Sequence, residues 1–345
     1  MIRLLALIAG LLAIPQDTDP APQNGITETR ILLGQSVISE GTTSTGAKAI
    51  RTGLTAFLER LNGRGGIDGR EVVLEPVERR PEAPRTARPT EALIAREGVF
   101  AMIGGLVRFR GSQARETERL VGYLVDERKL DRIAFLQRDD ARGDAARADL
   151  ENALARRGLE LTAAGRYRPG TIAIARGLHD IAAQSPQAVL VNGSRESAVA
   201  FIKAAKKNPA LRGTVFCCTS EIGTLELLRS LGTASEGCIV SQVVPFPWDT
   251  EIAVVAEYHE AMLEADAADQ IGFETLEGYL AGRVFEAAMR RVHGPLTRTG
   301  FVQALEQTRP MDLGGITASY GARRTQQGLD RIFLTKFTAG KVLPL

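Results

Sequence analysis

The chain has 345 residues, 44% of them hydrophobic, which is enough to build two cores rather than one. Its 43 Lys and Arg residues nearly balance its 41 Asp and Glu residues, and it holds only five Tyr and one Trp. The sequence therefore lacks the basic field and the stacking side chains that nucleic-acid binding requires, and we expect no nucleic-acid partner.

An apolar run at the N-terminus, from Leu4 to Ile14, follows a single arginine and ends at Pro15. It is too short to span a bilayer as a helix, which needs about 20 residues, but it suits the apolar core of a secretory signal. We therefore expect residues 1–14 to form a signal peptide and residues 15–28 a leader. The mature chain is then expected in the periplasm.

The elements that follow alternate between strand and helix. The first unit is predicted to hold a strand over 30–38, a helix ending at 61, a strand over 71–77, a helix over 90–97 and a strand over 99–103. The first helix ends at Asn62 to Gly66, a glycine-rich stop signal. This βαβ order predicts a parallel sheet that is covered on both faces.

A second α/β unit follows. Its predicted helices cover 115–127, 144–157, 172–184 and 196–206, and its predicted strands cover 132–136, 159–167, 188–191, 215–218 and 239–244. Two prolines in Pro245 to Asp249 then indicate a crossing back to the first unit. Two long helices, over 251–264 and 274–292, precede a C-terminal hairpin. Because open α/β sheets bind ligands at the carboxyl ends of their strands, a cleft between the two units is the expected site.

The three cysteines give no metal or redox motif. Cys217 and Cys218 are adjacent in a predicted strand and point to opposite faces, so they should not bond to each other. Either one of them pairs with Cys238 in an oxidising compartment, or all three are buried thiols. The three histidines are isolated from them, and we expect no metal and no cofactor.

The loop Gly41 to Lys48 is close to a phosphate-binding loop but departs from it in detail. Ala47 separates the second glycine from the lysine, and Ala49 stands where a hydroxyl for Mg²⁺ is needed. What remains is a helix start whose N–H groups, with the hydroxyls of Ser44 and Thr45, can hold a small anion or carboxylate.

Catalytic motifs are also incomplete. Gly193-Ser194 lacks the second glycine of a nucleophile elbow, and Tyr258-His259-Glu260 lacks the second histidine of a zinc hydrolase. We therefore expect no enzyme. A nucleotide- or sugar-processing enzyme on a Rossmann-like scaffold is the disfavoured alternative.

Several stretches together carry a family resemblance. They are Gly25 to Thr29, Ile31 to Ser36, Leu61 to Arg70, Val99 to Gly104 and Leu276 to Ala281. In order and spacing the chain resembles the bacterial extracellular solute-binding proteins of the leucine/isoleucine/valine-binding type. The resemblance implies a type I periplasmic-binding fold, in which two Rossmann-like lobes are joined by three crossings. It also implies closure on a small ligand, such as a branched-chain amino acid, that is delivered to the membrane permease of an ABC importer.

On this basis we assign the first lobe to residues 29–110 and 249–322, and the second to 111–248 and 323–345. The first lobe is shortened, because Ile103-Gly104 is followed closely by the stretch Arg108 to Gln113. The family has roughly 35 to 40 more residues at this point, which is more than one βα unit. In the family, the missing loops bind the ligand's carboxylate and ammonium. Their loss is expected to uncover apolar surface of the sheet. Either a partner covers that surface, or the first lobe is poorly stable.

The second lobe keeps more of the family pattern. Thr219-Ser220-Glu221 matches the family position whose acid pairs with an amino-acid ammonium, which makes Glu221 a candidate contact. Arg142 stands where the family has an aromatic residue, and Asn192 to Arg195 replaces an aromatic pair. Two arginines can form a bidentate carboxylate clamp, or they can be surface residues of their loops. The candidate ligand-binding residues are Ser44, Thr45, Arg142, Ser194, Arg195 and Glu221.

The sequence thus predicts a periplasmic solute-binding protein for an amino acid, amide or related carboxylate. Binding is expected to shift a hinge equilibrium toward a closed form that contacts the ligand from both lobes. The main alternative is a degenerate member that binds no small ligand and acts as a protein-interaction or sensor module, which the missing segment supports.

Overall fold

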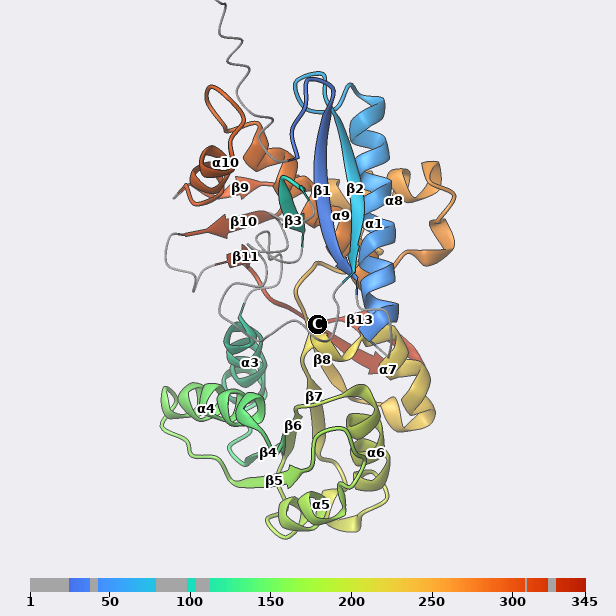
Figure 1. Cartoon of the computed structure of the whole chain (residues 1–345). Helices are drawn as coiled ribbons and strands as arrows, with labels where there is room; N and C mark the ends of the chain where they lie inside the picture. The colour runs from blue at the N-terminus through green and yellow to red at the C-terminus, as the bar shows by residue number, and fades with distance from the viewer. Residues whose placement is uncertain (1–24, 38–42, 79–97, 104–111, 308, 322–326) are drawn as a thin grey trace, which may run out of the picture.

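The structure is a computed structural model that describes residues 25–37, 43–78, 98–103, 112–307, 309–321 and 327–345. The predicted signal segment 1–14 and the predicted helix 90–97 lie outside the described residues. Figure 1 shows two α/β lobes, one above the other, with the C-terminus between them. The residue limits that we assign to the lobes from the sequence stay a prediction.

The first lobe contains a parallel sheet in the order β2-β1-β3. Its strands are β1 (Arg30–Val37), β2 (Glu71–Glu78) and β3 (Ala101–Ile103), and helix α1 (Thr43–Gly63) connects β1 to β2. The turn after α1 confirms the glycine-rich stop, because Gly66 has φ 69° and an added Cβ would lie 2.0 Å from the Arg70 carbonyl oxygen. The Asn62 side chain pins this turn by accepting from and donating to the Val72 backbone.

Helix α1 packs closely against α9 (Phe273–Met289), with α8 (Ala253–Glu264) beside them. An added Cβ on Gly278 would lie 1.9 Å from the Ile50 carbonyl oxygen, so the two backbones nearly touch. Next to this contact, the rings of Phe57 and Tyr279 meet edge to face with centroids 5.2 Å apart. The core of the first lobe is therefore built largely by this helix pair lying on the small sheet.

The edge of the small sheet is covered, contrary to the expectation of exposed apolar surface. All three residues of β3 are at most 3% exposed. Phe301 of helix α10 (Arg298–Leu305) packs on Phe100, with ring centroids 5.6 Å apart, and Arg298 donates to the Val99 and Phe100 carbonyls. Helix α10, which the sequence analysis did not place, thus covers the residues that lead into β3. A small antiparallel sheet lies beside it, formed by β9 (Met311–Asp312), β10 (Thr317–Tyr320) and β11 (Gln327–Leu329).

The second lobe contains a larger sheet in the order β13-β12-β8-β7-β6-β4-β5. Its strands are β4 (Ile133–Arg138), β5 (Ala163–Tyr167), β6 (Ala188–Val191), β7 (Val215–Cys218), β8 (Ile239–Gln242), β12 (Phe333–Thr338) and β13 (Lys341–Pro344). Its helices are α3 (Gln113–Val121), which continues as a π-helix over Gly122–Glu127, α4 (Ala141–Ala155), α5 (Ala175–Ala182), α6 (Arg195–Ala205) and α7 (Thr224–Leu231). Strands β4 to β8 are parallel, and β12 and β13 form the predicted antiparallel hairpin.

The shortening of the first lobe is visible in the connection between the lobes. Helix α3 packs in the second lobe, where its Leu120 shares a core with Leu150 of α4. Residues 104–112 alone join β3 to α3, which leaves no room for a further βα unit. The sequence-predicted fold class is confirmed: an α/β protein with two Rossmann-like lobes of the type I periplasmic-binding fold.

The three cysteines are free and buried. Cys217 belongs to one face of the large sheet and Cys218 to the other, as their adjacency in a strand predicts. The register pairs Cys218 with Val240, so Cys238 lies two residues away along the next strand. That offset is too long for a disulfide without backbone movement. Burial raises the pKa of all three thiols, and that of Cys238 to about 11.

Candidate functional site

The candidate site lies at the carboxyl ends of β4, β6 and β7 in the second lobe. These strands are neighbours in the sheet, with Leu136 paired to Val191 and Val191 paired to Cys218. The loops and helix starts that follow these strands carry Arg142, Ser194, Arg195 and Glu221. The topology therefore places four of the six sequence-predicted residues along one edge of one sheet.

The loops after β6 and β7 are joined directly. Arg195, at the first position of α6, donates from Nε to the Ile222 carbonyl at 3.0 Å. Its guanidinium lies against Gly223, where an added Cβ would be 2.9 Å from Nη2. Glu221 is exposed, whereas the flanking Ser220 and Ile222 are each 5% exposed. The structure thus brings Arg195 and the Glu221 loop together, with the Glu221 side chain at the surface.

Ser194 acts as the N-cap of α6. Its hydroxyl accepts from the Ser197 N–H at 3.3 Å, which satisfies one of the donors that a helix start leaves open. The preceding Gly193 has φ 148°, and an added Cβ would lie 1.6 Å from the Tyr167 hydroxyl oxygen. That hydroxyl in turn donates to the Asn192 carbonyl and accepts from the Ser197 hydroxyl. The Tyr167 side chain therefore fixes the loop after β6.

Arg142 lies in the first turn of α4 and is exposed. The neighbouring Asp140 caps this helix by accepting from the Gly143 N–H at 3.0 Å. Hydrogen bonds from Arg138 and from that N–H lower the pKa of Asp140. The Arg142 side chain makes no hydrogen bond or ion pair within the described part of the chain, so neither kind of bond joins it to Arg195 or Glu221.

The first lobe contributes the start of α1. Ser44 and Thr45 lie in the first turn of this helix, as the sequence predicts for a helix-start site, but their side chains lie outside what the structure describes. In Figure 1 this end of α1 points toward α7 of the second lobe. The first turn of α1, whose N–H groups have no partner within the helix, therefore faces the second lobe.

A small cavity lies where the lobes meet. Its volume is about 10 Å³, and it is lined by Ser220, Gln242, Val243, Val244, Phe273, Glu274 and Glu277. These residues come from the loop after β7, from the end of β8 and the two residues after it, and from the first turns of α9. This volume is room for about one water molecule, so the lobes are in close contact here.

The sequence analysis missed three carboxamides near the strand ends, Gln35, Gln137 and Asn192. Gln35, close to the end of β1, is 6% exposed, and its side-chain oxygen has no hydrogen-bond partner among the described residues. The side-chain oxygen of Asn192, directly after β6, is in the same situation. Buried acceptors of this kind normally find a donor, so each is a point where a ligand N–H or water can bind. Their signal in the sequence is a polar residue at the end of a buried strand.

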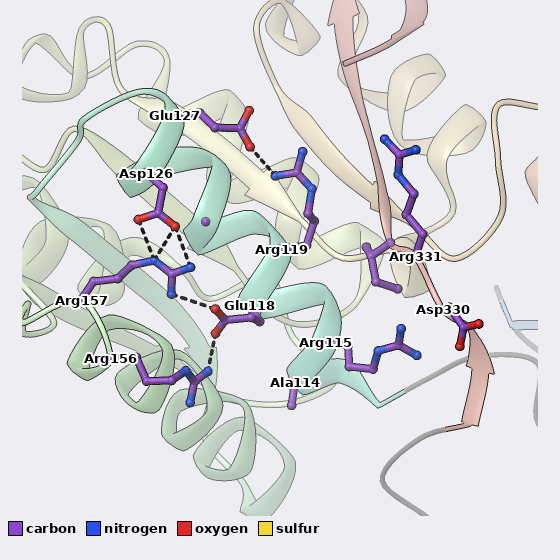
Figure 2. A pocket seen from close by; sticks show the side chains of 12 residues that line it. Ala114, Arg115, Glu118, Arg119, Asp126, Glu127, Arg156, Arg157, Asp330 and Arg331 are labelled. Atoms are coloured by element: carbon purple, nitrogen blue, oxygen red, sulfur yellow. Dashed lines mark hydrogen bonds and ion pairs between the residues drawn. The ribbon is translucent and has the colours of Figure 1, made fainter. Parts of the chain in front are cut away.

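A larger groove of about 680 Å³ runs beside α3, away from the strand ends (Figure 2). Its charges are mostly paired: Glu118 accepts from both Arg156 and Arg157, and Arg157 also pairs with Asp126 at 2.8 Å. Burial tends to raise the pKa of Glu118, but the hydrogen bonds from the two arginines outweigh it and lower the pKa. These residues hold α3 to α4, and we assign them a structural role.

Two lobes with parallel sheets, three connections and polar loops at the strand ends define the class of type I periplasmic-binding proteins. The chain belongs to the periplasmic binding protein family, whose model matches residues 105–341. This is a family of substrate-binding proteins, periplasmic or extracellular and generally without enzymatic activity. Among the described helices, none is long and apolar enough to cross a membrane.

Solved structures give the same fold. A possible leucine/isoleucine/valine-binding protein from Rhodopirellula baltica is 24% identical with a TM-score of 0.78, over 95% of this chain and 98% of that one. A substrate-binding protein of an ABC transporter from Aeropyrum pernix is 19% identical with a TM-score of 0.75, over 92% and 95%. A solute-binding protein of an ABC transporter from R. palustris, in complex with benzoate, is 17% identical with a TM-score of 0.70, over 91% and 95%. Curated protein sequences give no match.

Proposed function

We propose that the chain is an exported solute-binding protein that captures a small amino acid, amide or carboxylate and delivers it to the permease of an ABC importer. Residues 1–14 would serve as its export signal. One observation carries the proposal: Glu221 is the exposed residue of a loop that is anchored on both sides, at the strand ends where this fold binds ligands.

The charges of the site support an amino-acid or amide ligand. Glu221 offers a carboxylate to an ammonium or amide N–H, and the open oxygens of Gln35 and Asn192 are further acceptors. The η nitrogens of Arg195 and the guanidinium of Arg142 offer donors to a carboxylate. A ligand that carries both an N–H group and a carboxylate would use both sets.

A second candidate function is a degenerate family member that binds no small ligand. The cavity of about 10 Å³ between Ser220 and Glu277, together with the short connection over residues 104–112, favours it. Such a protein would use its surface for protein interaction or sensing. The two candidates differ in one property, the affinity for small molecules.

The experiment is calorimetric titration of the wild type and of Glu221→Gln with amino acids, amides and carboxylates. Removing one member of a desolvated charge pair costs roughly 2 to 5 kcal/mol, so Glu221→Gln should weaken binding of an ammonium ligand at least about thirtyfold. Glu160→Gln is the matched control, because Glu160 is exposed and lies before β5, at the other end of the sheet. Equal affinities of the wild type and Glu221→Gln would remove Glu221 from the site.

A further inference from the structure

A buried carboxylate lies beneath the candidate loop. Glu116 of α3 is 2% exposed, although glutamate is almost never fully buried without partners. Its Oε2 accepts from the Ser220 N–H at 2.8 Å and from the Ser241 hydroxyl at 2.6 Å. One side chain thus joins α3, the loop after β7 and strand β8.

These contacts, together with Arg195, bracket Glu221. Glu116 holds the N–H of the preceding residue, Ser220, and Arg195 holds the carbonyl of the following residue, Ile222. Both held residues are buried, and only the residue between them is exposed. Because the backbone is held on both sides of Glu221, this side chain can move only by changing its own rotamer. Such preorganisation reduces the entropy that is lost on binding.

The same carboxylate ties the loop to the places where the chain passes between the lobes. Helix α3 is the first element after the connection over residues 104–112, and Ser241 lies in β8, shortly before the crossing at Pro245 to Asp249. The neighbouring Gln242 is also fixed, since its side chain donates to Thr224 and Thr335. The loop therefore moves with the body of the second lobe when the lobes move relative to each other.

We propose that Glu116 is a positioning residue, which holds the Thr219–Ile222 loop so that Glu221 meets the ligand. It does not contact the ligand itself. The proposal rests on the proposed function for its effect on affinity, but the positioning of the loop can be measured without any ligand.

The test compares Glu116→Gln with Glu118→Gln. Both change one glutamate of α3, but Glu118 lies on the opposite face and pairs with Arg156 and Arg157. The two substitutions therefore both perturb α3, and only Glu116→Gln changes the acceptor of the Ser220 N–H. Ser241→Ala is a milder second variant, which removes one donor and leaves the carboxylate in place.

Two quantities are measured: hydrogen exchange at the Ser220 amide by NMR, and the dissociation constants of L-leucine, L-glutamine, L-glutamate and benzoate by calorimetry. Because a hydrogen bond to a charged acceptor is about twice as strong as one to a neutral acceptor, we expect about fivefold faster exchange in Glu116→Gln. The affinity for the best of the four probes should fall by a similar factor. Ser241→Ala should change both in the same direction by less, and Glu118→Gln should change neither.

Unchanged Ser220 exchange in Glu116→Gln and Ser241→Ala would overturn the proposal. So would equal effects of Glu118→Gln and Glu116→Gln, or faster exchange at unchanged affinity. If Glu116→Gln does not fold, Ser241→Ala decides. If the wild type binds none of the probes, the exchange data still decide whether Glu116 holds the loop, and the lack of binding counts against the proposed function alone.

Discussion

The two lobes reach a stable core by different means. The second lobe has a sheet of seven strands, with loops fixed by caps and buried hydrogen bonds, whereas the sheet described in the first lobe has three strands. In the first lobe, close packing of α1 on α9 and the cover from α10 take the place of further strands. The comparison teaches that a lobe with a small sheet can keep its core through close helix packing.

The largest expected effect concerns the α1–α9 contact. Phe57→Ala removes a ring that is 4% exposed and packs on Tyr279, and such truncations cost about 3 to 5 kcal/mol. Because this helix pair builds much of the core of the first lobe, we expect the first lobe to unfold before the second. Urea unfolding should show two steps, with exchange protection lost in β1 and α1 while β4 and β6 stay protected.

The matched control is Phe201→Ala in the second lobe, where Phe201 is fully buried against Phe216. Its truncation removes a similar area, but the larger sheet should unfold without an early step in the first lobe. A single cooperative transition in Phe57→Ala, shifted as much as in Phe201→Ala, would show that the two lobes are not stabilised differently.

A second prediction concerns how the lobes share the ligand. If the first lobe offers only Ser44, Thr45 and backbone N–H groups, the second lobe must hold most of the carboxylate. Each charge-assisted hydrogen bond is worth about 1.5 to 3 kcal/mol, so Arg195→Ala should weaken binding by tenfold or more, as should Arg142→Ala. The Ser44→Ala/Thr45→Ala double variant should lose less. If the double variant loses the most affinity of the three, the proposal that the two arginines hold the carboxylate is contradicted.

The smallest effect concerns the ion pairs of α3 with α4. The arginines lower the pKa of Glu118 in the folded state, so its stabilisation is complete above the unfolded value of about 4.3 and is lost as the pH falls through the folded value. Glu118 is 38% exposed, so the contribution should be about 0.2 to 1 kcal/mol. Glu118→Gln should therefore be slightly less stable than the wild type at pH 7 and equal to it once the pH has fallen well below the folded pKa of Glu118. A stability difference that persists at the lowest pH would assign the effect to packing instead.

Much of the fold could be predicted because its signals are local. The apolar spacing of α1, the glycines after Asn62 and the short apolar strands of the second lobe are each visible within a few residues. Helices α7 and α10 were not placed, because each is short and is held by tertiary contacts such as Phe301 on Phe100. Tertiary packing, rather than intrinsic propensity, stabilises helices of this length.

The candidate site shows the same limit. Ser194, Arg195 and Glu221 could be named because their stretches align with binding positions of the family that the sequence resembles. The residues that hold these loops in place could not be named, because Glu116 bonds to Ser220 and Ser241 across 104 and 125 residues of sequence. In the sequence, Glu116 is one acid among the charged residues of an ordinary surface helix, and only the fold shows that it is buried.

The central claim is that the chain binds a small ligand between its lobes. The most direct measurement is thermal unfolding of the wild type with amino acids, amides, dicarboxylates and nucleotides. A ligand at 100 times its dissociation constant adds about 2.7 kcal/mol of stability. The account predicts such a shift for at least one amino acid, amide or carboxylate and none for nucleotides. No shift with any of these compounds at millimolar concentration would contradict it and favour the degenerate member.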